Sequence, residues 1–500
     1  MVDSLIRGIP EVFQLLSLVL AFIGTLIGIV LGAIPGIGPP LAMAIFLPFI
    51  FGMSPIPAMM FLLGVYNGSV YGGSVSAILI NTPGTPGSVA TVFDGYPMAK
   101  KGKAGTALGI SLCSSAIGGI FSTIAFLLFY QPLNNLFIAF GPSQLFLLIL
   151  VAFLTVAILA KESIIKGLIA SGIGLLLGLV GYDLISGSTR FTFGYLFIED
   201  GLDLIAVLIG WFAITELMFL IQERQSTISG MDILRGGTWE GVKAVFRYPK
   251  EVFASASLGS IIGAIPGVGI AVANLVAYSS AKGRSKHPEE FGQGCIEGII
   301  APETANNAVT STSLIPTLAL GIPGGASAAI ILGALMMLGF RPGPGLYSEN
   351  PGLIGALVIG LVVINVMMFI SGFLLSKLYM KITQIKISVL VPVILVISLL
   401  GCYLARSRLS DIFFALLLGL FAYGLRKAGY SLACVVLGFI LAKMMEEYFF
   451  KALLISEGNI QIFFRGTINI ILLLFAALML LWEPIERLLK PKLSTKDQDH

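Results

Sequence analysis

The sequence is short of charge and of the side chains that carry acid, base and metal chemistry. Only 11% of its 500 residues are Asp, Glu, Lys or Arg, and it contains 2 histidines and 4 cysteines. Neither His287 nor the terminal His500 belongs to a Ser/His/Asp or HExxH arrangement, and no GxSxG motif occurs. The cysteines lack CxxC spacing, which disfavours metal ligation and a disulfide framework. Neither an enzyme nor a cofactor is therefore expected.

Charge is missing altogether from three long stretches, residues 12–93, 104–160 and 304–340. Hydrophobic residues make up 57% of the chain and the mean hydropathy is +0.98, whereas a soluble protein is roughly 25% charged. A soluble fold is excluded. The chain is predicted to be an all-α polytopic protein of the lipid bilayer.

Most basic residues lie in short segments between apolar runs, so they are interpreted as topology markers. The net charge of +4 is accordingly no sign of nucleic-acid binding. The predicted parts are a first membrane repeat with a helical extension (1–222), a cytoplasmic linker (223–250), a second membrane repeat with its extension (251–482) and a cytoplasmic tail (483–500). Arg406 and Arg408 disagree with this topology, since both fall on the predicted outer side.

Apolar runs long enough to cross a bilayer predict helices at 12–31, 107–130, 142–160, 164–181, 203–222, 352–374, 387–404, 409–425, 429–445 and 467–482. Two glycine and proline tracts, 66–87 and 306–325, lie outside these runs, and about 11 to 13 transmembrane or re-entrant helices are expected in all. Irregular backbone inside a membrane is tolerated only where protein or a water-filled cavity receives its peptide groups. The tracts are therefore expected to build a binding site.

A short motif occurs twice. Gly32-Ala-Ile-Pro-Gly-Ile-Gly38 recurs as Gly263-Ala-Ile-Pro-Gly-Val-Gly269, with six identities in seven positions at an offset of 231. Further on, Pro83-Gly84 matches Pro323-Gly324 at an offset of 240, so the second half carries nine extra residues between its motifs. Duplicated halves are the usual construction of secondary transporters, whose sites lie where the repeats meet.

Corresponding loops of the two halves differ in their content of basic residues. Residues 51–57 are uncharged, whereas 282–290 contain lysine and arginine. The converse holds after the second motifs, where 100–103 contain three lysines and 341–349 only one basic residue. Equivalent loops are thus predicted on opposite sides of the membrane, which gives two inverted-topology repeats with broken helices.

In each Gly-Ala-Ile-Pro-Gly-x-Gly motif the proline removes an amide donor and the glycines permit positive φ, so one helix should end and a half-helix begin. The N-terminus of a half-helix presents free amides and a positive dipole end, which suits a carboxylate. Close helix packing through small residues would explain a single glycine motif. Repetition of the proline favours a site, and no Lys-Ser/Thr follows that would indicate a phosphate loop.

The tracts supply hydroxyl and amide groups that can bind carboxylates and coordinate Na⁺, although Ser and Thr also bond back to their own helix. The candidate substrate-binding residues of the first half are Gly36, Gly38, Asn67, Ser69, Gly72, Gly73, Ser74, Asn81, Thr82, Pro83, Gly84 and Thr85. Those of the second half are Gly267, Gly269, Asn306, Asn307, Thr310, Ser311, Thr312, Pro323, Gly324 and Gly325. The candidates for cation coupling are Glu303, Ser76 and Ser313. No metal site is expected apart from Na⁺ at these tracts.

Glu303 is the acidic residue nearest a tract. An intramembrane carboxylate is by default a functional-site hypothesis, here a cation or proton site. The alternative is a position at the membrane interface, below the charged segment 282–290. Asp94 is expected in a loop, and Tyr71 and Tyr278 are either pocket walls or interfacial aromatic residues.

At these residues the sequence resembles the large membrane subunit of tripartite tricarboxylate transporters, the TctA-like family. The resemblance covers nearly the whole chain. It is carried by the paired Gly-Ala-Ile-Pro-Gly motifs, Tyr66-Asn-Gly-Ser-Val-Tyr-Gly-Gly73, Asn81-Thr-Pro-Gly-Thr-Pro-Gly87, Asp94-Gly-Tyr-Pro97, Ala301-Pro-Glu-Thr-Ala-Asn-Asn307 and Gly321-Ile-Pro-Gly-Gly325. The resemblance implies a multi-pass subunit of the bacterial inner (cytoplasmic) membrane. Such a subunit works with a small membrane subunit and a periplasmic solute-binding protein, and imports citrate-like carboxylates with Na⁺ or H⁺ as coupling ion.

No Walker motif is present, so the energy for uptake must come from an ion gradient or from another subunit. Citrate carries about two to three negative charges, each worth roughly 2.3 kcal/mol per 100 mV, so import against an inside-negative potential needs several cations. Two other classes also fit broken helices. An anion-conducting channel would use them as a selectivity filter, and a non-transporting scaffold would show no transport phenotype when the tracts are mutated.

Overall fold

The computed structural model describes residues 2–159, 163–183, 187–222, 237–376 and 387–489. Helices dominate the described chain. Its two strands, β1 (Gly181–Tyr182) and β2 (Thr189–Arg190), pair antiparallel with Gly181 opposite Arg190. The predicted all-α polytopic class is confirmed.

The helices of the first half are α1 (Val2–Val12), α2 (Leu15–Gly32), α3 (Pro39–Phe46), η1 (Leu47–Ile50), α4 (Pro55–Ile80), η2 (Pro86–Ser88), α5 (Val89–Lys100), α6 (Ala104–Ile138), α7 (Pro142–Leu159), α8 (Ile164–Gly178), α9 (Leu196–Glu199), α10 (Leu204–Leu208), η3 (Ile209–Ile214) and α11 (Thr215–Gln222). Those of the second half are α12 (Thr238–Val245), α13 (Pro249–Ala264), α14 (Gly269–Arg284), η4 (Pro288–Glu290), α15 (Glu297–Thr312), α16 (Leu314–Leu320), α17 (Ala326–Met337), α18 (Leu346–Glu349), α19 (Pro351–Leu374), α21 (Ile387–Arg406), α22 (Leu409–Lys427), α23 (Leu432–Ile455), η5 (Ile460–Phe464) and α24 (Thr467–Leu489).

Every apolar run predicted as a span coincides with helix. Among the described residues, the helical segments long and apolar enough to cross a membrane are Leu15–Gly32, Ala104–Ile138, Leu204–Gln222, Pro351–Leu374 and Leu409–Lys427. Other apolar helices, such as α17, are too short to cross alone. Within the predicted linker and tail, residues 223–236 and 490–500 lie outside the described residues, and α12 forms part of the remaining linker.

The helix breaks are shorter than the two tracts that predicted them. Residues 66–80 continue α4 and residues 306–312 belong to α15, so most of each tract is helical, contrary to expectation. The chain leaves the helix only after a left-handed residue, Asn81 (φ 56°) or Gly321 (φ 71°). Small polar residues are accommodated in these helices because hydroxyls bond to their own helix and neighbouring helices pack closely around them.

The two halves repeat one series of elements, in which α2 to α6 correspond to α13, α14, α15 with α16, α17 and α19. Gly36 and Gly267, equivalent at the offset of 231, have φ values of 86° and 83°. Asn81 and Gly321, equivalent at the offset of 240, are both left-handed. As predicted, one helix ends before Gly36 and another begins at Pro39. In the second half, one helix ends before Gly267 and another begins at Gly269.

In both halves the first helix packs against the third in the same register. Gly28 of α2 lies against Val65 of α4, and Gly32 lies against Ser69, so the contacting residues are 37 apart and the helices run parallel. The equivalent contacts of α13 with α15, 46 residues apart, are Gly259 with Ala305 and Gly263 with Val309. The difference between these separations is the nine-residue insertion found in the sequence.

Equivalent helices of the two halves run antiparallel. Ser74 of α4 bonds to Glu303 of α15, whereas Asn67, two turns earlier, bonds to Thr310, two turns later. The contacts of α6 with α19 reverse in the same way and join Leu112 to Gly372 and Gly119 to Asn365. An inverted-topology repeat requires this arrangement.

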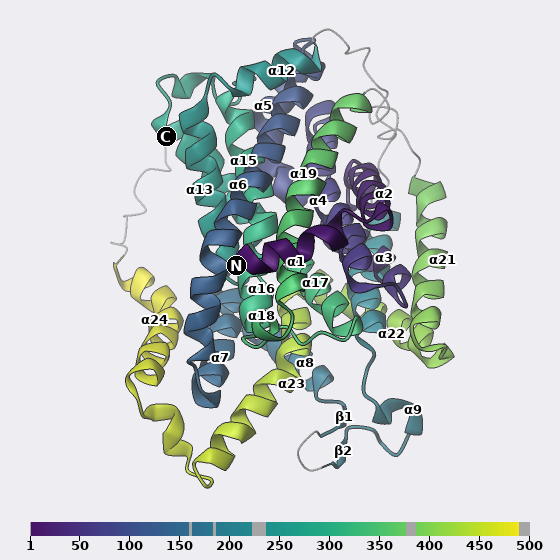
Figure 1. The fold of residues 1–500 in the computed structure, drawn as a ribbon, viewed down its shortest axis with the longest axis vertical. Coiled ribbons are helices and arrows are strands. Elements are labelled where there is room, and N and C mark those ends of the chain that lie inside the picture. Colours follow the sequence, from purple (N-terminus) through teal and green to yellow (C-terminus); the bar gives the residue numbers. More distant parts are fainter. Residues whose placement is uncertain (1, 160–162, 184–186, 223–236, 377–386, 490–500) are drawn as a thin grey trace, which may run out of the picture.

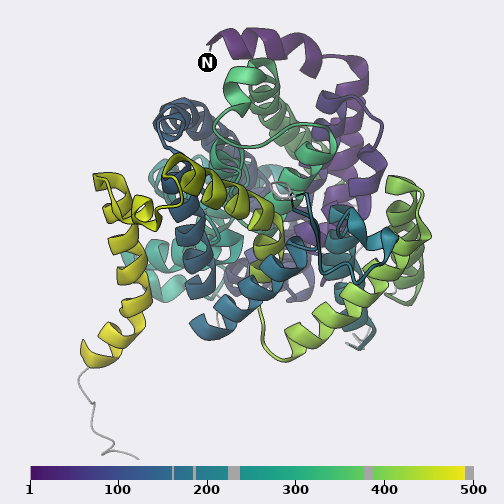
Figure 2. The ribbon, with the colours of Figure 1, turned by 90° about the horizontal axis from the view of Figure 1, so that it is seen from below.

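Figure 1 shows α6, α13, α15 and α19 along the long axis, with α12 at one end and β1, β2 and α9 at the other. In Figure 2, seen from below, α24 stands on one flank and α21 with α22 on the opposite flank. Helices of the second extension therefore lie on opposite flanks of the molecule.

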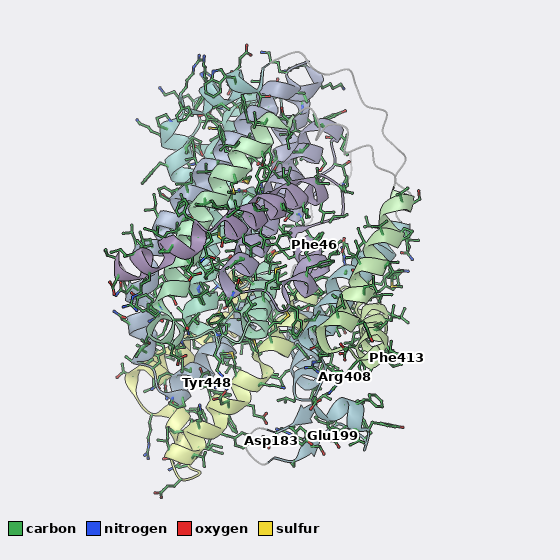
Figure 3. The ribbon with its side chains drawn as sticks, turned by 45° about the vertical axis from the view of Figure 1, so that its right-hand side comes forward. Phe46, Asp183, Glu199, Arg408, Phe413 and Tyr448 are labelled. Atoms are coloured by element: carbon green, nitrogen blue, oxygen red, sulfur yellow. The ribbon has the colours of Figure 1, made fainter. Side chains whose placement is uncertain are left out.

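The two basic residues that disagree with the predicted topology, Arg406 and Arg408, lie at the end of the molecule that carries β1 and β2. Arg406 Nε lies 2.9 Å from Asp203 Oδ2, and Arg408 Nη1 lies 2.8 Å from Asp200 Oδ2. Figure 3 shows Arg408 at the same end as Asp183 and Glu199. Both arginines pair with the acidic loop, but the positive-inside pattern counts Lys and Arg rather than net charge, so these two residues remain an exception to the predicted topology.

Candidate functional site

A cavity of about 400 Å³ lies where the helix breaks of both halves meet. Its walls come from the start of α3, the second Gly-Ala-Ile-Pro-Gly motif with the start of α14, the segments that follow both helix breaks, and α4, α7, α15 and α23. The lining residues are Pro39, Pro40, Tyr66, Thr85, Pro86, Gly87, Val156, Gly267, Val268, Gly269, Ile270, Ala271, Val309, Ser313, Gly324, Gly325, Ala326, Ser327, Ala328, Ser431, Ala433 and Leu437.

Several helices begin at this cavity. The first residues of α3, α14 and α17 line it, as do η2, which leads into α5, and the start of α23. The first amides of a helix have no partner within it, and its N-terminus carries partial positive charge. No lining residue is charged. The partial positive charge of these helix ends favours an anion in a cavity that is otherwise uncharged.

The two repeats are in direct contact at the cavity. Within the second repeat, the Gly267 amide donates to the Gly324 carbonyl over 3.0 Å and joins the motif to the break of the same repeat. Gly87 of the first break faces Ile270 and Asn306 of the other repeat, and a Cβ at Gly87 would lie 2.6 Å from Asn306 Oδ1. The site therefore requires both halves of the chain.

The structure brings only part of the predicted substrate set to the cavity surface. The predicted residues that line it are Thr85, Gly267, Gly269, Gly324, Gly325 and Ser313. The predicted residues outside its lining are Gly36, Gly38, Asn67, Ser69, Gly72, Gly73, Ser74, Ser76, Asn81, Thr82, Pro83, Gly84, Glu303, Asn306, Asn307, Thr310, Ser311, Thr312 and Pro323. Many of these lie directly behind the wall, on α4 and α15.

Most tract hydroxyls bond back to their own helix, which was the alternative left open by the sequence. Ser69 donates to the Tyr66 carbonyl over 2.9 Å and Thr312 to the Ala308 carbonyl over 2.9 Å. The hydroxyls of Ser76 and Ser313, predicted to couple a cation, do the same. A bound ion would have to compete with these bonds.

Sequence reasoning missed several walls of the cavity. Tyr66 stands at the start of the first tract, and its hydroxyl interacts with Ser313 and Ser327. Val156 and Ser431 come from α7 and the start of α23, which carry no repeat motif. The start of the tract was a signal for Tyr66, whereas no motif or spacing pointed to α7 or α23.

Two asparagines behind the wall differ in how their amides are used. Asn67 donates to the Leu63 carbonyl over 3.0 Å and accepts from Thr310 over 3.0 Å. Asn306 is buried, and neither polar atom of its side chain has a protein hydrogen-bond partner. A buried polar group without a partner is costly, so an unused amide beside Gly87 is available to a ligand.

Glu303 is fully buried in α15 and accepts hydrogen bonds from four hydroxyls of the other repeat. Ser74 donates to Oε1 over 2.6 Å, and Thr91 donates to the same oxygen. Ser111 and Ser115 donate to Oε2 over 2.8 and 3.0 Å. We call these five residues the Glu303 cluster. Burial places Glu303 in the protein interior. No basic side chain pairs with it among the described residues, so hydroxyl dipoles alone support its charge.

Asp94 is also buried, and the expectation of a loop residue is wrong. It lies in α5, where its Oδ1 accepts the amides of Gly292, Gly294 and Cys295 over 2.7 to 2.9 Å. Its Oδ2 accepts the hydroxyl of Tyr278 over 2.9 Å. Asp94 thus ties α5 to the segment that precedes α15, and Tyr278 serves this connection, while Tyr71 is packed in the core.

Comparison with known proteins gives one family and two relatives. A family model described as the tripartite tricarboxylate transporter TctA family matches residues 18–437. An "Uncharacterized 52.8 kDa protein in TAR-I ttuC' 3'region" of Agrobacterium vitis is 36% identical over 468 residues, 94% of this chain and 93% of the relative. An "Uncharacterized protein in TAR-II ttuC' 3'region" of the same organism is 36% identical over 210 residues, 42% of this chain and 87% of the relative. No solved structure matches.

Proposed function

The chain belongs to the tripartite tricarboxylate transporter TctA family, and from that premise we propose that it is the large permease subunit of a binding-protein-dependent secondary transporter. Its substrates are tricarboxylates or related, citrate-like carboxylates. It works in the bacterial inner membrane with a small membrane subunit and a periplasmic solute-binding protein. Uptake is driven by symport of Na⁺ or H⁺.

The central cavity is the observation that carries this proposal. It is lined by uncharged residues of both repeats and by several helix N-termini. Dipoles and hydroxyls hold an anion without a fixed cation, and such an anion is released more readily than one in a salt bridge. A carrier must release its substrate in every cycle, so this balance suits transport.

The Glu303 cluster is the candidate for cation coupling. A buried carboxylate surrounded by hydroxyl oxygens can take up a proton or, after the hydroxyls rotate, a Na⁺ ion. Glu303 lies one helical turn before Asn306, which faces the cavity wall at Gly87. The cluster joins α15 to α4, α5 and α6, so cation binding and the arrangement of the repeats affect each other.

Counterflow and gradient-driven uptake in proteoliposomes test the proposal. The protein, with its small subunit, is offered a panel of labelled carboxylates while Na⁺ and pH are varied separately, with the binding protein added or withheld. Accumulation above the external concentration under an imposed Na⁺ or H⁺ gradient is expected. Equilibration without accumulation would indicate a channel, and absence of any carboxylate flux would contradict the proposal.

A further inference from the structure

A second cavity lies at the end of the molecule that carries β1 and β2, between α17 and α23. Its volume is about 750 Å³, and its walls include Met336, Arg341, Lys443, Glu447 and Lys451. A smaller neighbour of about 300 Å³ shares Met336 and Lys443. We call the larger cavity with this neighbour the α17–α23 groove. Figure 3 labels Tyr448, which also lines it, at the same end as Asp183 and Arg408.

The lining of the groove has an excess of positive charge, with four basic and three acidic residues. Lys451 pairs with Glu447 at 2.5 Å. In the smaller part, Asp200 and Asp203 are paired with Arg408 and Arg406. The remaining cations, Arg341 and Lys443, have no acidic partner among the described residues.

The groove and the central cavity lie along the same pair of helices. The first turns of α17 and α23 line the central cavity, at residues 326–328 and 433–437. The last turns of the same helices line the groove, at residues 332–337 and 443–454. The uncharged central cavity and the cationic groove are thus the inner and outer ends of one helix interface.

We propose that the α17–α23 groove is a separate entry site for a small multivalent carboxylate, held by Arg341 and Lys443 before it reaches the central cavity. This inference rests on the proposed function. Unpaired cations in a groove concentrate an anionic ligand there and speed its association. The central cavity, which lacks charge, cannot supply this long-range attraction.

Thiol labelling tests the groove without requiring transport. Met336→Cys is introduced into a variant whose four native cysteines, all buried, have been replaced. Met336 is 48% exposed and is not one of the proposed ligands. Its reaction with a maleimide is measured in phosphatidylcholine liposomes with increasing citrate, and with glycerol as the uncharged control. Citrate is expected to slow labelling, and glycerol is not.

The added substitutions Arg341→Gln and Lys443→Gln should remove this protection and raise the KM for uptake about tenfold while kcat stays the same, because both act before the central site. Arg465→Gln removes a cation outside the groove and should change neither measurement. Equal protection in the neutralised variant, or none in the parent, would overturn the entry site.

Two further experiments, with phosphatidylglycerol and with the binding protein, identify what the groove binds. If phosphatidylglycerol slows labelling and citrate cannot compete, the groove is a lipid headgroup site and the proposal is wrong. If neutralisation changes KM only when the binding protein is present, the groove is a protein docking surface and the proposal is again wrong. Citrate protection in a protein that transports no carboxylate would uphold the groove and contradict the proposed function.

Discussion

At the level of single residues, two buried carboxylates differ in the partners that hold them. Glu303 and Asp94 are both fully buried carboxylates, yet their partners differ in kind. Glu303 accepts four hydroxyl bonds, and hydroxyls can turn to accept as well as donate. Asp94 Oδ1 accepts three backbone amides, which can only donate. Glu303 is therefore suited to changes of protonation or ion binding, and Asp94 to a fixed structural contact.

Glu303→Gln is expected to fold, because the amide can accept from some of the surrounding hydroxyls and donate to others. Gradient-driven carboxylate uptake should fall at least about tenfold, whereas counterflow, which needs no net movement of the cation, should persist. Both are measured in the same proteoliposomes. Ser76→Ala is the control, since its hydroxyl bonds only to its own helix at Gly73. Equal gradient-driven uptake by Glu303→Gln and the parent would exclude the cluster from coupling.

Asp94→Ala should lower thermal stability strongly, because it leaves buried amide donors without an acceptor, at about 1–3 kcal/mol for each unsatisfied group. Asp94→Asn keeps one acceptor oxygen and should lose less. Asp3→Asn changes an exposed carboxylate, 81% accessible, and serves as the control. Thermal unfolding in detergent gives the order of stability. Equal midpoints for all three variants would contradict the structural role.

Asn306→Ala is expected to raise the substrate KM with little loss of stability, because the amide it removes has no protein partner. Asn67→Ala should instead reduce stability, since it breaks bonds to Leu63 and Thr310. Uptake kinetics and unfolding midpoints, measured together, separate the two effects. An unchanged KM for Asn306→Ala would remove this side chain from the site.

At the scale of elements, the helix breaks are positioned by packing as much as by proline and glycine. Gly28, Gly32, Gly259 and Gly263 let the first and third helices of each repeat approach until backbone touches backbone. That close parallel pairing brings each Gly-Ala-Ile-Pro-Gly motif beside the Pro-Gly break of the same repeat. The cavity follows from this geometry, because four breaks are thereby held together.

Gly259→Ala should destabilise the second repeat, because its Cβ would lie 2.5 Å from the Ala305 carbonyl oxygen. Overpacking of this kind costs about 1–3 kcal/mol. Gly28→Ala, in the first repeat, should behave similarly, since it would collide with the Val65 carbonyl. Gly172→Ala in α8 is the matched control, because nothing lies within 4 Å of the added Cβ. Membrane insertion and thermal unfolding measure the result, and a neutral Gly259→Ala would show that the helices separate easily.

At the scale of the whole molecule, two inverted repeats share one site and one buried cluster. The contacts that reach Glu303 and those between Gly87 and Asn306 all pass from one repeat to the other. A movement of one repeat against the other would therefore change both the central cavity and the Glu303 cluster. The α17–α23 groove lies at the end of the molecule where Figure 1 shows β1 and β2.

Inverted topology predicts that equivalent loops face opposite sides of the membrane. Phe51 follows η1 and Gly283 lies in the last turn of α14, at the equivalent ends of the two halves. Both positions are open to Cys substitution, since Phe51 is 55% exposed and nothing lies within 4 Å of a Cβ at Gly283. In a background without the native cysteines, an impermeant maleimide should label position 51 in intact cells. Position 283 should react only after the membrane is opened. Labelling of both from outside would refute the inverted arrangement.

The sequence indicated the class, most of the helices, the duplication and the nine-residue insertion, although residues 66–80 and 306–312 are helical against expectation. Hydrophobic runs and repeated motifs are local properties, which the chain carries wherever its parts lie. It also indicated the residues around the site, because proline and glycine act on the backbone at their own positions.

Only the tertiary structure decided which of those residues face a cavity and which support it from behind. Ser76 and Ser313 bond to their own helices, whereas Ser111 and Ser115, from a helix with no tract, hold Glu303. Val156 and Ser431 enter the wall from helices that carry no motif. The physical reason is that the direction of a side chain and the partner it meets depend on how helices far apart in the sequence cross, and no local pattern encodes that crossing.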